Sequence, residues 1–414
     1  MRISWALART LSIVPLGVLA LQPASAKAQS YEAPPSFNAA QISGIDRVGA
    51  NYTIRTPVRS DGLMREYVLD TPYGEIRIQG DAFLKMRLNE LVALALLEKV
   101  SSSDTFGKSL VEAGLNPIKY TGRLITNPLG TVQSTLSGIG GMFSRIGSGL
   151  NNAGKTQDNA LAGLLGVTTE RRTIAAAYGV DPYTDFEPLD AKLKQLSEAA
   201  ALGGLAVSGA LLAVPGAAGI VVTNLSTANK LDNIAITDLA RQYTAAQILD
   251  LNRERLTAMG VSKELSAVIL ANRSYTPIDM AAMVAALDSM KDVAGRPVFI
   301  DRAAAADTRG GAYFMRQMAE LMAKDYRARG YTQIVALRGL PFASTRDGRI
   351  VTVAPIDALS WTQESATRFG SFTTERKALA PKANGELRIT GEATALAKKQ
   401  LKTEGWSVVE KQKP

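Results

Sequence analysis

The stretch that most directly decides the fold is residues 67–81, which read Tyr-Val-Leu-Asp-Thr-Pro-Tyr-Gly-Glu-Ile-Arg-Ile-Gln-Gly-Asp. Apolar and polar side chains alternate over residues 75–79, which is typical of a strand with one face in water. Turn-forming residues at 71–74 separate this strand from an apolar run before it, so the stretch predicts a β-hairpin. Gly80 ends the second strand, and Asp81 is placed to cap the helix that follows.

The helix after this hairpin presents an apolar face. At helical spacing that face carries Leu84, Leu88, Leu91 and Ala95. Such a face favours packing over the hairpin, and further strand signals begin near Gly49, so we assign residues 47–115 to a small α/β domain. The polar, proline-containing residues 27–46 before it are expected to form a flexible arm.

The middle of the chain, residues 158–329, has the signals of a helical domain. Residues 244–247 form a capping box, and Gly260 lies where a helix C-cap is expected. Thr276 and Pro277 place an N-cap before a proline at the first helical position. Methionines at helical spacing in 280–322 are more typical of core packing than of an adaptable binding face.

The C-terminal residues 330–414 return to mixed structure. Residues 332–337 and 349–353 are predicted strands, with a turn at 347–348. The chain then ends in a predicted strand, helix and strand at 387–389, 392–403 and 406–409. We therefore expect an α+β protein with an N-terminal β-hairpin and helix unit, a large helical middle and a small C-terminal α/β unit.

The first residues have the features of a secretory signal peptide. Arg2 and Arg9 supply a positive start, residues 11–21 are mainly apolar, and residues 24–26 form an Ala-x-Ala cleavage site. We interpret residues 1–26 as a signal peptide and expect an exported protein of the periplasm or cell envelope. No cysteine is available for lipid attachment.

Composition excludes several classes of site. The 414 residues are 46% hydrophobic and 21% charged, which is typical of a globular chain, but include no Cys and no His. Disulfides, thiolate nucleophiles, Cys-ligated metals, Ser–His relays and imidazole pH switches are therefore excluded. Removal of residues 1–26 takes away two arginines and no acid, so the net charge falls from +9 to +7. The remaining charges are dispersed, and we expect no nucleic-acid partner.

A regular apolar stripe lies in the Gly/Ser-rich segment 116–157. Spacings of three and four place on it Leu129, Val132, Leu136, Ile139, Phe143, Ile146 and Leu150. The other face is mostly Ser, Thr and Gly, a composition typical of a helix that lies in a membrane interface. A close-packed helix whose glycines admit a neighbouring backbone fits the same pattern. We propose the stripe as a membrane or partner contact and leave both interpretations open.

A second apolar segment, residues 199–229, contains no charged side chain. Its densest part, 202–222, would just cross a hydrocarbon core of about 30 Å as a helix. Pro215 interrupts it, and small residues are abundant. A buried helical hairpin and a membrane-inserted segment are both consistent with this composition.

Two further motifs are weaker. Residues 149–156 match the phosphate-binding pattern GxxxxGK[ST], with Asp301 as a candidate acidic partner. No buried strand precedes the motif, so we interpret it as a flexible glycine turn and expect no cofactor. The acidic residues Asp181, Asp185, Glu187 and Asp190 lack the spacing of a calcium loop, and indicate a turn before an acid-rich helix start. We expect no metal.

These observations favour an exported, envelope-associated, non-catalytic binding or scaffolding protein that contacts a membrane through 127–151 and 199–229. Its partner is then a membrane surface or an envelope protein, and the sequence identifies no small-molecule ligand. The alternative is an exported hydrolase of envelope polymers that uses carboxylate or Ser/Lys chemistry. No spacing singles out its catalytic residues, and the missing histidines disfavour an enzyme.

Overall fold

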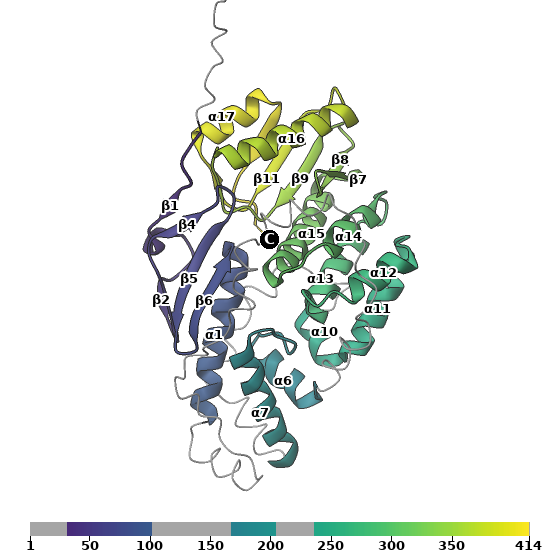
Figure 1. The fold of residues 1–414 in the computed structure, drawn as a ribbon. Helices are drawn as coiled ribbons and strands as arrows, with labels where there is room; N and C mark the ends of the chain where they lie inside the picture. The colour runs from purple at the N-terminus through teal and green to yellow at the C-terminus, as the bar shows by residue number, and fades with distance from the viewer. Residues whose placement is uncertain (1–30, 102–166, 204–235, 414) are drawn as a thin grey trace, which may run out of the picture. The chain divides into compact units, whose positions relative to one another are not determined.

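The computed structural model describes residues 31–101, 167–203 and 236–413 (Figure 1). Contacts divide the chain into two units, Met1–Tyr31 and Glu32–Pro414, and the elements below belong to the second. Strands come first, helices follow, and strands and helices mix toward the C-terminus. The expected α+β class is confirmed.

The N-terminal sheet is built around the predicted hairpin. Its strands are β1 (Ser36–Phe37), β2 (Val48–Gly49), β3 (Tyr52–Ile54), β4 (Val58–Ser60), β5 (Arg65–Thr71) and β6 (Gly74–Gln79). β5 and β6 pair antiparallel along their lengths, which confirms the hairpin. Gly80 has a φ of +95°, a conformation that favours glycine, and α1 (Asp81–Ser101) begins directly after it.

Helix α1 covers the sheet with the face that the sequence indicates. Leu84 and Leu91 are fully buried, Leu88 is almost so, and they share a core with Leu69 of β5. Residues 32–46 belong to the stretch expected to be a flexible arm. In the structure they include β1, which pairs with β4, and the short 3₁₀ helix η1 (Ala39–Gln41), whose first residue is buried in this core.

Helices make up the middle of the chain. They are α6 (Thr169–Ala177), α7 (Glu187–Gly203), α10 (Ile236–Gln242), α11 (Ala245–Ala258), α12 (Lys263–Leu270), α13 (Pro277–Asp288), α14 (Arg296–Ala304) and α15 (Arg309–Arg329). Thr244 and Gln247 form the predicted capping box of α11, and Gly260 follows its C-cap with a φ of +79°. Thr276 caps α13, with Pro277 at its first position, also as predicted.

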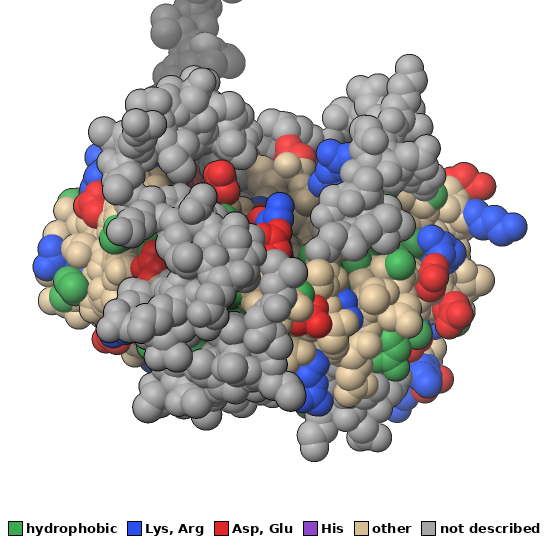
Figure 2. Space-filling model, turned by 90° about the horizontal axis from the view of Figure 1, so that it is seen from below, with side chains coloured by type: hydrophobic (Ala, Val, Ile, Leu, Met, Phe, Trp, Pro, Cys, Tyr) green, Lys and Arg blue, Asp and Glu red, His purple; other side chains and the backbone are tan. Residues whose placement is uncertain are grey.

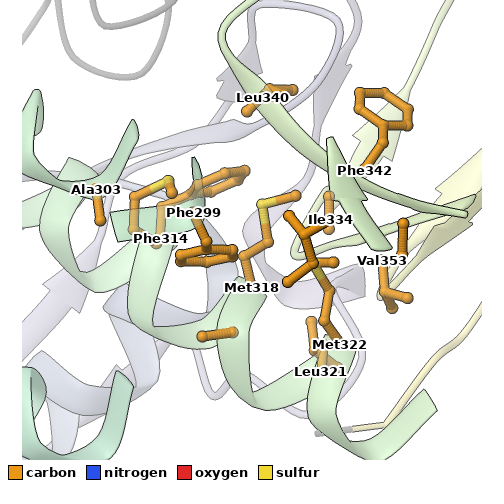
Figure 3. Close-up of a cluster of buried hydrophobic side chains, with 14 of the residues drawn as sticks. Phe299, Ala303, Phe314, Met318, Leu321, Met322, Ile334, Leu340, Phe342 and Val353 are labelled. Carbon is orange, nitrogen blue, oxygen red and sulfur yellow. The ribbon is translucent and has the colours of Figure 1, made fainter. Parts of the chain in front are cut away.

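The main core lies where α13, α14 and α15 meet the C-terminal sheet. Figure 3 shows side chains of α14 and α15 packed against residues of that sheet, such as Ile334 and Val353. The helical methionines belong to this core and are each no more than 2% exposed: Met280, Met283, Met290, Met315, Met318 and Met322. Their role is core packing, the interpretation that the sequence favours.

The C-terminal sheet has the strand order β13-β11-β9-β8-β7. Its strands are β7 (Tyr331–Leu337), β8 (Leu340–Thr345), β9 (Ile350–Ala354), β11 (Gly385–Ile389) and β13 (Trp406–Val409). The sequence misses β8, which joins β7 through a tight turn at Arg338 and Gly339, both with positive φ. β8 is buried along most of its length, so it lacks the alternation that identifies a strand with one wet face.

The predicted strand–helix–strand end of the chain is confirmed. β11 and β13 pair parallel, and α17 (Ala395–Thr403) connects them. The helix starts later than the expected Glu392, because β12 (Glu392–Ala393) pairs with β10 (Ala358–Leu359) and Thr394 is the N-cap. The remaining helix, α16 (Gln363–Leu379), leads into β11.

Residues far apart in sequence join the N-terminal and C-terminal sheets. The carbonyl oxygen of Leu63 accepts hydrogen bonds from the backbone N–H groups of Asp357 and Ala358. The Asp357 carboxylate in turn accepts from the backbone N–H groups of Arg65 and Asp81, so it caps the start of α1. The N-terminal and C-terminal sheets are therefore held together by main-chain hydrogen bonds and by the Asp357 carboxylate.

Candidate functional site: a buried chain of charged groups

The residues proposed from the sequence as a membrane or partner contact lie outside the described residues. This holds for the whole stripe: Leu129, Val132, Leu136, Ile139, Phe143, Ile146 and Leu150. It holds equally for the glycine motif at 149–156 and for most of the segment 199–229. Asp301 is described, but it lies inside α14 and pairs with Arg302. It therefore does not follow a strand, as the acidic partner of a phosphate loop should.

The most distinctive polar feature of the described residues is a chain of buried charged groups. It starts on α1, where Arg87 donates from one guanidinium nitrogen to Glu90 Oε2 at 2.6 Å and from another to Asp185 at 3.0 Å. Arg87 and Glu90 are 5% and 3% exposed. The guanidinium also lies over the ring of Phe186, 4.9 Å from its centroid, which adds a cation–π contact.

The turn between α6 and α7 supplies the next groups. Gly179 ends α6 with a φ of +64°, and the Asp181 carboxylate then accepts the backbone N–H of Tyr183 at 2.8 Å. This local hydrogen bond fixes the turn. Thr184 donates its hydroxyl proton to Glu90 Oε1 at 2.5 Å, and Asp185 receives Arg87. The turn thus places three oxygen-bearing side chains against α1 and α13.

Helices α13 and α15 complete the chain. Asp279 closes the capping box of α13 and is 1% exposed. Its carboxylate accepts from Arg316 of α15 at 2.7 Å and pairs with Arg309, at the start of the same helix. Arg309 also reaches Asp185 at 3.4 Å, and Arg316 reaches Glu320 at 3.2 Å. Acidic and basic groups therefore alternate in one connected series: Glu90, Arg87, Asp185, Arg309, Asp279, Arg316 and Glu320. We call this series, together with Asp181, the ion cluster.

Asp181 is connected to the ion cluster through a shared hydroxyl. Thr276 Oγ1 lies 2.6 Å from Asp181 Oδ2 and 3.0 Å from Asp279 Oδ2, and it accepts the backbone N–H of Asp279 at 3.1 Å. A hydroxyl has only one proton to donate. The two carboxylates therefore compete for it unless one of them carries a proton of its own.

Environment separates the pKa values of these carboxyl groups. Burial raises the pKa of Glu90 to about 7, and burial with the charge of Asp279 raises that of Asp181 to about 6. Burial acts on Asp279 and Asp185 in the same direction, but their arginine partners outweigh it and lower both pKa values. Asp279 and Asp185 are thus the stably ionised members.

The chemistry of the ion cluster favours a structural role over catalysis. The hydrolase alternative expects convergent carboxyl groups with shifted pKa values in an open cleft. The shifted groups are present, but Glu90, Asp279 and Glu320 are at most 3% exposed and bonded to protein partners. Asp185, at 39%, is the most exposed side chain of its ion pairs. In the described part of the chain no group of acidic residues is arranged to hold a metal ion.

The acidic residues 181–190 divide between two roles. Glu187 and Asp190 lie in the first turn of α7, so the predicted acid-rich helix start is confirmed. Asp190 pairs there with Arg171 of α6. Asp181 and Asp185 belong to the ion cluster instead, a role that the sequence does not reveal because their partners are distant. The signal that was available is an arginine on an apolar helix face, as at Arg87.

An apolar cavity lies apart from the ion cluster. About 440 Å³ of space, its opening included, is lined by residues such as Met64, Phe342, Phe369 and Leu387, with Arg368 also in the lining. A cavity with an apolar lining of this kind stays dry. We assign no ligand to it.

Comparisons with known proteins give no relative for this chain. No protein-family model matches it, and no curated protein or solved structure does.

Proposed function

We propose that this protein is an exported, envelope-associated, non-catalytic binding or scaffolding protein that contacts a membrane through residues 127–151 and 199–229. The composition of residues 1–26 supports the export. The apolar stripe of 127–151 and the uncharged length of 199–229 support the contact. The described structure adds one observation, which concerns where these segments leave the fold.

Helices α1 and α7 pack side by side and run in the same direction. Near their starts, Arg87 of α1 bonds to Asp185, just before α7. Near the end of α1, the charge of Glu98 acts on Lys192 of α7 and partly offsets the lowering of the Lys192 pKa by burial. Leucines of both helices share one core between these points. The C-terminal ends of α1 and α7 therefore point the same way.

This arrangement supports the proposal, because each of the two helices precedes one of the apolar segments along the chain. Residues 102–166 follow α1 and include the stripe, while residues 204–235 follow α7 and include most of the second segment. The described parts of the chain that precede the two segments thus end at the same end of one helix pair. Two weak membrane contacts tethered in this way bind far more stably than either alone, because the second is intramolecular.

Few large hydrophobic side chains are exposed on the described surface. Its exposed large hydrophobic side chains are Tyr31, Val48 and Leu379. On the face shown in Figure 2, the described hydrophobic side chains are scattered among charged ones. No helix among the described residues has both the length and the apolar character needed to cross a membrane.

Vesicle flotation of the chain without residues 1–26 tests the proposal. We expect the protein to float with anionic vesicles, and Leu136→Glu with Phe143→Glu to reduce the floating fraction at least tenfold, because two buried charges are costly in a membrane interface. The matched control is Ser134→Glu with Ser148→Glu, which adds the same charge to the opposite face of the stripe.

The control pair should float as the unchanged protein does. Leu211→Glu with Val221→Glu extends the test to the second segment and should also reduce flotation. A protein that stays with the soluble fraction at every vesicle concentration contradicts the proposal. Equal loss from the stripe pair and from the control pair also contradicts it, because charge rather than apolar contact would then explain the result.

A further inference from the structure

The ion cluster contains more acidic than basic groups. Its carboxyl groups are Glu90, Asp181, Asp185, Asp279 and Glu320, and its guanidinium groups are Arg87, Arg309 and Arg316. If every group were ionised, two negative charges would be left without a partner. Asp185 is 39% exposed and Asp181 and Arg309 are half-buried, whereas the other five groups are buried. An unpaired buried charge is strongly destabilising, and a group in that position takes up a proton instead.

We propose that the ion cluster is a proton-binding joint: it holds one proton on Glu90 and one on Asp181 in the folded protein, and their release as the pH rises weakens the contact of α1 and the 178–186 turn with α13 and α15. The inference does not depend on what the apolar segments contact. It follows from the charge balance and from the geometry at each of the two protonated groups.

Among the described residues, Glu90 shares its only arginine partner with another carboxylate. Arg87 donates to one of its oxygens, but the same guanidinium also serves Asp185. Its other oxygen lies 2.5 Å from Thr184 Oγ1, and this hydroxyl donates to Glu90 when the carboxyl group is ionised and accepts its proton when it is neutral. Across the cluster Glu90 faces the negative charge of Asp185 and the positive charge of Arg309. One shared arginine cannot neutralise two carboxylates, so Glu90 retains a proton.

Asp181 is identified by the shared hydroxyl of Thr276. When Asp181 is protonated, its proton lies between Oδ2 and Thr276 Oγ1, and the Thr276 proton is free to bond to Asp279. When Asp181 is ionised, the same hydroxyl satisfies only one of two adjacent carboxylates. Both Arg309 and Arg316 are committed to Asp279, which leaves Asp181 without an ion-pair partner of its own within the cluster.

The groups that face these two acids come from every element of the joint. α1 contributes Arg87, the turn contributes Asp185 and Tyr183, α13 contributes Asp279, and α15 contributes Arg309. Further along α15, Arg316, Tyr313 and Glu320 lie around Asp279. On α6, Arg171 bonds to Pro182 O within the turn and pairs with Asp190 of α7, while Arg172 acts with it on Tyr183. None of these is a histidine.

The direction of the pH effect follows from these pKa values. The pKa values of Glu90 (about 7) and Asp181 (about 6) lie above the ordinary values of these side chains. Between about pH 4 and 7 the folded state therefore binds more protons than the unfolded state. Stability must then fall as the pH rises through this interval. The chain has no histidine, which is the side chain that ordinarily titrates in this pH range. Few other groups therefore contribute to the proton uptake that the experiment measures.

Potentiometric titration of the whole chain tests the joint. Between pH 8.5 and 5.5 we expect Glu90→Gln to take up about 0.9 proton fewer than the unchanged protein, Asp181→Asn about 0.75 fewer, and the double variant about 1.7 fewer, as their pKa values require. The control, Asp250→Asn, removes an exposed carboxylate of α11 that pairs with Arg253, and should take up as many protons as the unchanged protein. Uptake by the double variant equal to that of the unchanged protein overturns the proposal.

Hydrogen–deuterium exchange reports on the contact itself. Peptides covering 83–94 and 276–287 should lose at least tenfold protection between pH 6 and 8.5 in the unchanged protein, after correction for intrinsic exchange. They should lose less in the double variant, whose cluster stays neutral. Equal pH dependence in both proteins overturns the joint. If the variants do not fold, carboxyl ¹³C shifts of the unchanged protein decide instead, and the absence of a carboxyl group that titrates above pH 5.5 overturns it.

Discussion

Arg87, Arg309 and Arg316 show at the level of single residues how charges are accommodated inside this protein. Each guanidinium bonds to carboxylates from two positions, and each lies beside at least one aromatic ring. Arginine suits this role because its planar guanidinium group can donate to two acceptors while its flat face stacks on an aromatic ring. Removing one carboxylate leaves such a group buried without its partner.

Asp279 is the residue whose loss should be most costly. Asp279→Ala leaves Arg309 and Arg316 without their shared acceptor, and we expect a decrease of about 3–5 kcal/mol in the free energy of unfolding. Urea denaturation followed by circular dichroism measures it. Asp250→Ala, which breaks an exposed pair, serves as the control and should change stability little. Equal effects of the two variants would show that burial of the cluster does not matter.

The acid side of the stability profile should depend on the other two aspartates. The pKa values of Asp185 and Asp279 are lowered, so the unfolded state binds more protons once the pH falls below about 4. Stability should therefore fall toward acid, opposite to the effect of Glu90 and Asp181 at higher pH. Urea midpoints at pH 3, 5 and 8 should pass through a maximum near pH 5, and a steady rise up to pH 8 would contradict the assignment.

At the scale of elements, the two capping boxes offer a matched comparison. Thr244 caps α11 near the surface, whereas Thr276 caps α13 and also serves Asp181 and Asp279. We expect Thr244→Ala to cost about 1 kcal/mol. Thr276→Ala should cost about 2–3 kcal/mol, because it also removes a hydroxyl from the buried Asp279 and the half-buried Asp181. Thermal unfolding of both variants tests the difference, and equal losses would limit Thr276 to capping.

Glycines of the C-terminal unit offer a second comparison. A Cβ at Gly391 would overlap the backbone of Asp357, whereas a Cβ at Gly370 in α16 meets nothing within 4 Å. Gly391→Ala should therefore destabilise the protein, and Gly370→Ala should stabilise it by about 0.5–1 kcal/mol. Opposite shifts of the thermal midpoint are expected. An unchanged midpoint for Gly391→Ala would mean that the 357 and 391 backbones separate easily.

Local signals account for the elements that sequence predicts. The capping boxes, the hairpin at 67–79 and the final strand–helix–strand depend on neighbouring residues, which one chain segment contains. β8 is missed because its burial on both faces removes alternation, and its turn has an arginine at positive φ. The ion cluster is missed for a different reason. Arg87, Asp185 and Arg309 are about 100 residues or more apart, and only the fold brings them together.

At the scale of the whole molecule, hydrogen bonds join the N-terminal and C-terminal parts of the described fold. Glu32 accepts from the backbone N–H of Trp361 and from the hydroxyl of Thr394, and its own N–H donates to Trp361 O. The ion cluster joins α1 and the turn before α7 to α13 and α15. The helix pair that leads into the apolar segments is thus fixed to the rest of the fold at its starting end.

The membrane contact at the ends of α1 and α7 is tested most directly by a single labelled cysteine, since the chain has no cysteine of its own. Ala201→Cys places an exposed label on the last turn of α7, and Ala378→Cys places one near the end of α16. With vesicles whose lipids carry a quencher at headgroup depth, the label at 201 should be quenched at least twofold more than the label at 378. Equal quenching at both positions, or none at either, would contradict the proposed contact.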